Sequence, residues 1–136
     1  MKHQIQLDLV IYGFDVDPDQ ITSFLAIQPS VTWRKGDRIG TSALKRKHNG
    51  WSLSSGLNKT DDFDQHLNAI IRTIEPSIGK FSSLPAAVEV ELSCAVSLRE
   101  DSPESLPAIY FQAQAVSVLA KLKAEIDFDL YLLPAK

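Results

Sequence analysis

Alternating apolar and polar residues predict most of the strands of this chain. Apolar residues occupy every second position from Ile5 to Ile11, and the same period recurs from Val88 to Leu98 and from Ile126 to Leu133. Because successive side chains of a strand point to opposite faces, each segment predicts a strand with one face in the core and one in water. Shorter strands are predicted at residues 31–34, 51–54 and 108–111.

Three segments carry the apolar spacing of three to four residues that is typical of amphipathic helices. The first begins at Asp17-Pro18, where the aspartate can cap the helix and the proline suits the first helical position, and it stops before Pro29. The second presents Phe63, Leu67 and Ile70 on one face, and the third covers residues 115–124.

The predicted element order is β-α-β-β-α-β-β-α-β, and its first six elements match the split βαβ order of ferredoxin-like folds. We therefore predict a single α+β domain over residues 1–136. It has a ferredoxin-like core, a mostly antiparallel sheet and helices packed on one face. A chain of 136 residues, 44% hydrophobic and 23% charged, is the size and composition expected for one globular core.

The composition and the end segments of the chain indicate which compartment and which classes of partner to expect. The single cysteine, Cys94, excludes an intrachain disulfide and fits a reducing compartment. No apolar stretch approaches the length of a membrane span or follows the N-terminus as a signal peptide would. A net charge of −3 disfavours wholesale binding to nucleic acid or to an anionic membrane. We expect a cytoplasmic protein that does not bind membranes.

Several short segments, in this order and spacing, resemble a known bacterial family, the domain of unknown function 4279 family. They are Ile11-Tyr12-Gly13-Phe14, Asp17-Pro18-Asp19-Gln20-Ile21-Thr22, Leu25-Ala26-Ile27-Gln28-Pro29-Ser30, Arg34-Lys35-Gly36-Asp37, Gly50-Trp51-Ser52-Leu53-Ser54 and Phe128-Asp129-Leu130-Tyr131. The resemblance extends over nearly the whole chain. It implies an αβ domain of a cytoplasmic bacterial protein, and it carries over no catalytic residue.

The segment between Trp33 and Trp51 is strongly basic. It holds six lysines and arginines against a single acidic residue, Asp37, so it carries +5 and the rest of the chain carries −8. Such a segment is suited to steering an acidic protein partner. A basic segment with aromatic residues is also suited to gripping phosphates and stacking a base. The candidate binding residues are Trp33, Arg34, Lys35, Arg38 and Trp51.

Acidic residues form a second group, on the water-facing side of the predicted strands: Asp8, Glu89, Glu91, Asp127 and Asp129. Oxygen clusters of this kind suit hard cations, and paired carboxylates can divide acid and base roles. The simpler interpretation is a solvated sheet face whose charge is neutralised by the basic segment, because like charges on neighbouring strands repel each other.

Enzyme signatures are absent from the sequence. It contains no nucleophile elbow and no glycine-rich phosphate loop. Cys94 falls on the inward face of its strand, where a thiol is inert. His66 follows Asp62 by four residues, a weak zinc signal that we assign to a polar helix face. We therefore predict no catalytic residue, no metal site and no cofactor.

These observations favour a non-catalytic binding or protein-interaction module, of the kind that immunity proteins represent, acting on an acidic protein partner. One alternative is a nucleotide or nucleic-acid binder that uses the same segment, which the net charge makes less favoured. The other is an enzyme with a carboxylate site on the sheet face. We also consider a homodimer, because an uncovered sheet face or edge can pair with a second copy.

Overall fold

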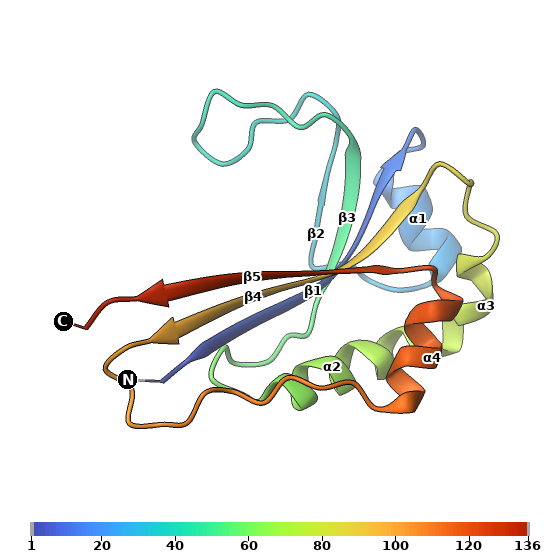
Figure 1. Ribbon diagram of the computed structural model, residues 1–136. Coiled ribbons are helices and arrows are strands. Elements are labelled where there is room, and N and C mark those ends of the chain that lie inside the picture. The colour runs from blue at the N-terminus through green and yellow to red at the C-terminus, as the bar shows by residue number, and fades with distance from the viewer. Residues whose placement is uncertain (1, 136) are drawn as a thin grey trace.

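The alternating segments form a mixed sheet in the computed structural model, which describes residues 2–135 (Figure 1). The strands are β1 (Gln4–Phe14), β2 (Val31–Trp33), β3 (Asn49–Ser54), β4 (Glu89–Arg99) and β5 (Glu125–Leu133). The helices are α1 (Pro18–Leu25), α2 (Phe63–Ile74), α3 (Ile78–Phe81) and α4 (Ala113–Lys121), with a 3₁₀ turn at Glu75–Ser77 between α2 and α3.

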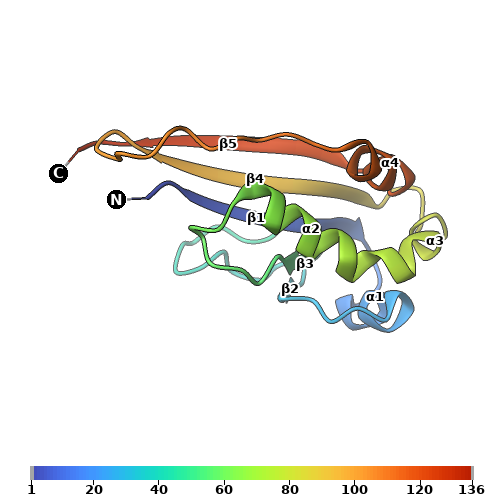
Figure 2. The same cartoon turned by 90° about the horizontal axis from the view of Figure 1, so that it is seen from below.

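The five strands lie in the order β2-β3-β1-β4-β5. All neighbouring strands are antiparallel except β4 and β5, which are parallel and are joined through α4. The helices cover one face of the sheet, and the other face is open (Figures 1 and 2). The α+β class, the mostly antiparallel sheet and the one-sided helix layer are thus confirmed, and the strand order is compatible with the expected ferredoxin-like arrangement.

The core lies between the sheet and the helices. β1 is the central strand: its register sets Leu9 opposite Leu53 on β3, and Leu7 opposite Cys94 on β4. Leu7, Leu9 and Cys94 are fully buried. Burying one such apolar side chain stabilises the fold by about 1.5–3 kcal/mol. The apolar face of α2 packs on these strands through Phe63, Leu67, Ile70, Ile71 and Ile74.

Local signals determine where the helices begin. The Asp17 side chain accepts a hydrogen bond from Asp19 N at 2.9 Å, with Pro18 at the first helical position of α1. At the start of α2, Asp62 N donates to Gln65 Oε1 at 3.0 Å. Both arrangements satisfy backbone groups that the first turn of a helix leaves unpaired.

The strand predicted at residues 108–111 is wrong. The segment 101–112 runs without regular secondary structure through the helix layer, beneath β5 (Figures 1 and 2). The Phe111 ring packs against Phe63 at 5.3 Å and against Phe128 at 6.3 Å between ring centroids. The apolar pattern of residues 108–111 therefore reflects partial burial of their side chains and not pairing with a neighbouring strand. The third helix also begins at Ala113 and ends at Lys121, earlier than predicted.

Candidate functional site

The connection between β2 and β3, residues 34–48, forms a hairpin that we call the basic hairpin. It projects on the side of the sheet opposite to the helices (Figure 1). Arg46 N donates to Asp37 O at 2.7 Å, and Gly36 N donates to Arg46 O at 2.9 Å. Ile39 N donates to Leu44 O at 2.9 Å nearer the tip. These bonds hold the hairpin as an ordered projection.

Arg34 anchors the base of the basic hairpin to α1. Its Nε and Nη2 donate to the two carboxylate oxygens of Asp17 at 2.9 and 3.0 Å. This hydrogen bonding lowers the pKa of Asp17 below its usual range. The backbone N of Arg34 also donates to Asp37 Oδ2 at 2.8 Å. Asp17 is the capping residue of α1, so Arg34 joins the hairpin to a helix start and has a structural role.

A hollow of about 400 Å³ lies between the basic hairpin and the sheet. The guanidinium carbon of Arg46 lies 4.3 Å from the centre of the Trp33 ring, the distance of a cation–π contact. The rings of Tyr12 and His48 lie 6.5 Å apart. The walls combine aromatic, aliphatic and cationic groups, which are Tyr12, Trp33, Ile39, Leu44, Lys45, Arg46, Lys47 and His48.

Beside the hollow, an acidic stripe crosses the open faces of β4 and β5. It consists of Glu89, Glu91, Glu125, Asp127 and Asp129. The register places Glu91 opposite Glu125 and Glu89 opposite Tyr12. The hydrogen bond between Tyr12 and Glu89, more than burial, raises the pKa of Tyr12 to about 12. The stripe therefore meets the hollow at Tyr12.

Repulsion within the acidic stripe affects Glu91 most clearly. Burial raises its pKa, and the nearby charges of Asp127, Glu125 and Asp129 raise it further. No group of three or more ligand-type side chains suited to a metal ion occurs within residues 2–135. Across those residues, no ion pair within 4.0 Å joins the stripe to the basic hairpin. The expected neutralisation by direct pairing is therefore wrong, because the hairpin rises from β2 and β3 whereas the stripe lies on β4 and β5.

The Glu91→Gln variant is expected to unfold at a higher temperature than the wild type at neutral pH. Removing the charge relieves cross-strand repulsion worth roughly 0.5 kcal/mol, or about 1–3 °C in Tm. The folded-state pKa of Glu91 is raised. The stabilisation that this raised pKa provides is therefore fully present below the pKa that Glu91 has in the unfolded chain. It is lost as the pH rises through the folded-state pKa of Glu91.

The gain in Glu91→Gln should accordingly shrink as the pH is lowered, because the wild-type carboxyl then becomes protonated as well. Calorimetric melting at several pH values measures this, with Glu104→Gln, outside the stripe, as control. An equal gain at acidic and neutral pH would contradict the electrostatic explanation.

The predicted binding residues separate into two groups. Trp33 is half-buried in the hollow, and Lys35 and Arg38 are exposed on the hairpin. Trp51 is fully buried in the core, where its Nε1 donates to Thr22 Oγ1 at 3.0 Å, so it is not available at the surface. Arg34 is engaged by Asp17.

Sequence reasoning missed Tyr12 and His48 as walls of the hollow, and Arg46 as the partner of Trp33. A signal for Tyr12 was present, since it continues the water-facing alternation of the first strand. The contact between Arg46 and Trp33 leaves no local signal, because twelve residues of the hairpin lie between them in the sequence.

Two further groups that the sequence singled out, His66 and Cys94, lie in the core. The Ser55 hydroxyl contacts His66 Nδ1, but His66 is 1% exposed and its Nε2 is buried without a hydrogen-bond partner. The expected position of His66 on a polar helix face is therefore wrong, because its side chain lies in the core. Cys94 is buried as expected, and burial together with the charge of Asp8 raises its pKa to about 11.

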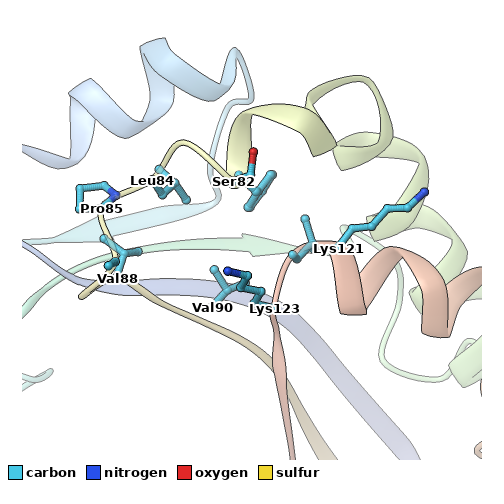
Figure 3. Close-up of a pocket in the computed structure, with 10 residues that line it drawn as sticks. Ser82, Leu84, Pro85, Val88, Val90, Lys121 and Lys123 are labelled. Atoms are coloured by element: carbon cyan, nitrogen blue, oxygen red, sulfur yellow. The ribbon is translucent and has the colours of Figure 1, made fainter.

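A second, smaller hollow of about 160 Å³ lies between α3, α4 and the start of β4. Figure 3 shows Val88 and Val90 at its floor and Lys121 extending away from them. Two chain segments, the loop through Pro85 and the turn at Lys123, complete its walls. It offers less space than the hollow beside the basic hairpin.

The fold and the site define a small α+β protein with a helix-covered sheet whose open face is flanked by a cationic hairpin. The family model for the domain of unknown function DUF4279 matches residues 3–133, nearly the whole chain. The chain belongs to this family, as the sequence resemblance indicated. A comparison with curated proteins finds no match. Within the described part of the chain, none of the helices is both long and apolar enough to cross a membrane.

Proposed function

We propose that this protein is a non-catalytic interaction module that binds an acidic segment of another protein between the basic hairpin and the open sheet face. The observation that carries the proposal is the hollow itself, in which an apolar surface lies directly beside three consecutive cations, Lys45, Arg46 and Lys47. Among residues 2–135 no carboxylate forms an ion pair with these three cations. Arg46 lies over the Trp33 ring, so the charges of Lys45 and Lys47 in particular are directed at solvent or at a partner.

The combination suits a polypeptide in which an apolar side chain neighbours carboxylates. Ile39 and Leu44, 38% and 69% exposed, provide an apolar contact surface at the hairpin. The cations beside them complement carboxylates and raise the rate of encounter with an acidic partner. A module that masks a partner in this way would act as immunity proteins do, by occupying a surface and without chemistry of its own.

A nucleotide or nucleic acid is less well matched to the same site. The Arg46 guanidinium already lies over the Trp33 ring, where a base would stack. An enzyme that uses the stripe is also less well supported, since no metal-ligand group occurs within residues 2–135.

The test is charge reversal of the hairpin by Lys45→Glu, Arg46→Glu and Lys47→Glu together. Binding of a short fluorescent peptide of Glu and Asp with central leucines is measured by anisotropy. We expect the variant to bind at least about tenfold more weakly, a loss of about 1.4 kcal/mol. Raising the salt concentration should weaken binding to the wild type, because the contacts lie at the surface.

The matched control reverses the same number of charges elsewhere, with Lys59→Glu, Lys80→Glu and Lys121→Glu, and should bind the peptide nearly as well as the wild type. An equal loss in both variants would reduce the effect to net charge and contradict a specific site. A single-stranded oligonucleotide that binds the wild type more tightly than the peptide would favour the nucleic-acid alternative.

A further inference from the structure

The two edges of the sheet differ in how they are protected. β2, at one edge, is three residues long, and a short edge strand gives a neighbouring chain little to pair with. β5, at the other edge, has nine residues and contains no proline, glycine, lysine or arginine. It lies at the rim of the sheet (Figure 2). The usual devices that block an edge are therefore absent from β5, apart from carboxylates on its open face.

The outer backbone groups of β5 are available for pairing. Glu100 N donates to Leu133 O at 3.1 Å, on the side of β4. Because backbone groups alternate along a strand, the even-numbered residues direct theirs outward. Within residues 2–135, no backbone hydrogen bond from another segment reaches these outward groups. The side chains beside them are also uncovered, with Leu130 and Leu132 66% and 67% exposed.

We propose that β5 pairs with β5 of a second copy of this chain, antiparallel, about a two-fold axis through Leu130 and perpendicular to the sheet. The two sheets would join into one, with both helix layers on the same side. This inference goes beyond the proposed function and does not depend on it. A symmetric pair is the commonest form of protein self-association, and it requires one surface to complement itself.

The charge pattern and the length of β5 together favour this register. Residues opposite each other must share a face, so the axis passes through a residue. An axis at Asp129 would set that carboxylate against its own copy, and an axis at Phe128 would set Asp127 against Asp129. Like charges directly opposite each other destabilise a strand pair. Axes at Leu130, Tyr131 and Leu132 avoid both conflicts, and of these the axis at Leu130 pairs the longest stretch of β5.

The register centred on Leu130 also matches the side chains. Asp129 faces Tyr131 of the second copy on the open side, and Phe128 faces Leu132 of the second copy on the helix side. Two more exposed apolar residues, Leu106 and Tyr110, lie on the segment that runs through the helix layer beneath β5 (Figure 1). They would extend the contact beyond the strand and bury area that one strand pair alone does not provide.

The first experiment measures mass in solution by light scattering over a dilution series. We expect the wild type to show twice the chain mass of 15.1 kDa at the higher concentrations. The Leu130→Lys variant should stay monomeric, because the two-fold axis would place the two lysines directly opposite each other and their charges would repel. Leu44→Lys is the matched control, since Leu44 is 69% exposed on the basic hairpin, and it should remain dimeric.

A wild type that stays at 15.1 kDa throughout the series would overturn the proposal. Pairing of β5 with a strand of a different protein would not rescue it. A Leu130→Lys variant that remains dimeric would overturn it as well, since the contact would then lie elsewhere. Leu130 is exposed, so the substitution leaves the core intact and the result reports on association.

Cysteine cross-linking tests the register. The axis brings the two copies of residue 130 into a backbone-bonded pair with Cα atoms about 5.5 Å apart, within disulfide range. Under mild oxidation, Leu130→Cys should form a covalent dimer and Leu132→Cys should not. The one native cysteine, Cys94, is buried and gives no background. Equal cross-linking of the two variants would overturn the register.

Discussion

Replacing Trp51 with alanine is expected to lower the free energy of unfolding by about 3–5 kcal/mol, the cost of emptying the site of a large buried aromatic residue. Trp51 is fully buried on β3, opposite Ile11 of the central strand. Its indole Nε1 also donates to Thr22 Oγ1 on α1 at 3.0 Å. The variant therefore loses packing, and the Thr22 hydroxyl loses the donor that the indole provides.

Trp51→Phe separates the two contributions. It keeps most of the packing and removes the indole donor, so we expect a smaller loss, of which about 1 kcal/mol comes from the hydrogen bond. Urea unfolding measures both variants, and the slope of the free energy with urea shows whether the unfolding remains two-state. Trp33→Ala, at the half-buried tryptophan, should lower the free energy of unfolding by less than Trp51→Ala does. Equal losses would contradict the assignment of Trp51 as the core tryptophan.

The second large effect is expected from Gly50→Val. A β-carbon at position 50 would lie 2.0 Å from Cε2 and Cζ2 of Trp33, far closer than atoms approach. The Trp33 ring must leave its place over Gly50, and with it the contact with the Arg46 guanidinium. Crowding of this kind costs about 1–3 kcal/mol. The hollow changes shape as well, so binding of the acidic peptide should weaken together with stability.

Gly79→Ala provides the matched control. Gly79 lies in α3, and a β-carbon there meets no atom within 4 Å. Alanine is favoured over glycine in a helix, so this variant should be as stable as the wild type or more stable by up to about 1 kcal/mol. Urea unfolding and tryptophan fluorescence compare the two variants. A Gly50→Val protein with unchanged stability and unchanged fluorescence would contradict the contact between Trp33 and Gly50.

The two proposed surfaces are separate on the molecule and can be lost separately. Peptide binding depends on the basic hairpin beyond β2, whereas self-association depends on β5 at the opposite edge of the sheet. The hairpin variant should therefore keep its dimeric mass, and Leu130→Lys should keep its affinity for the peptide. A monomeric protein that still binds the peptide would leave the proposed function intact and contradict only the pairing of β5 with a second copy.

Local pattern in the chain was enough to place the long strands and their faces. The alternation around Leu7, Leu9 and Cys94 identified side chains that the structure buries completely. Asp17-Pro18 predicted the start of α1, because capping is a contact between near neighbours in sequence. The acidic residues were likewise predicted on the open face, since a two-residue period determines which side chains share a face.

Contacts between distant segments were decided only in the folded molecule. Nothing near Trp33 or Trp51 distinguishes them in the sequence, and the register of β3 against β1 places Trp51 on the core side and leaves Trp33 at the hollow. The bond between Arg34 and Asp17, and the projection of the basic hairpin on the open side of the sheet, depend in the same way on how the sheet is assembled. The physical reason is that periodicity and capping report on neighbours along the chain, whereas pairing across strands also depends on which segments meet.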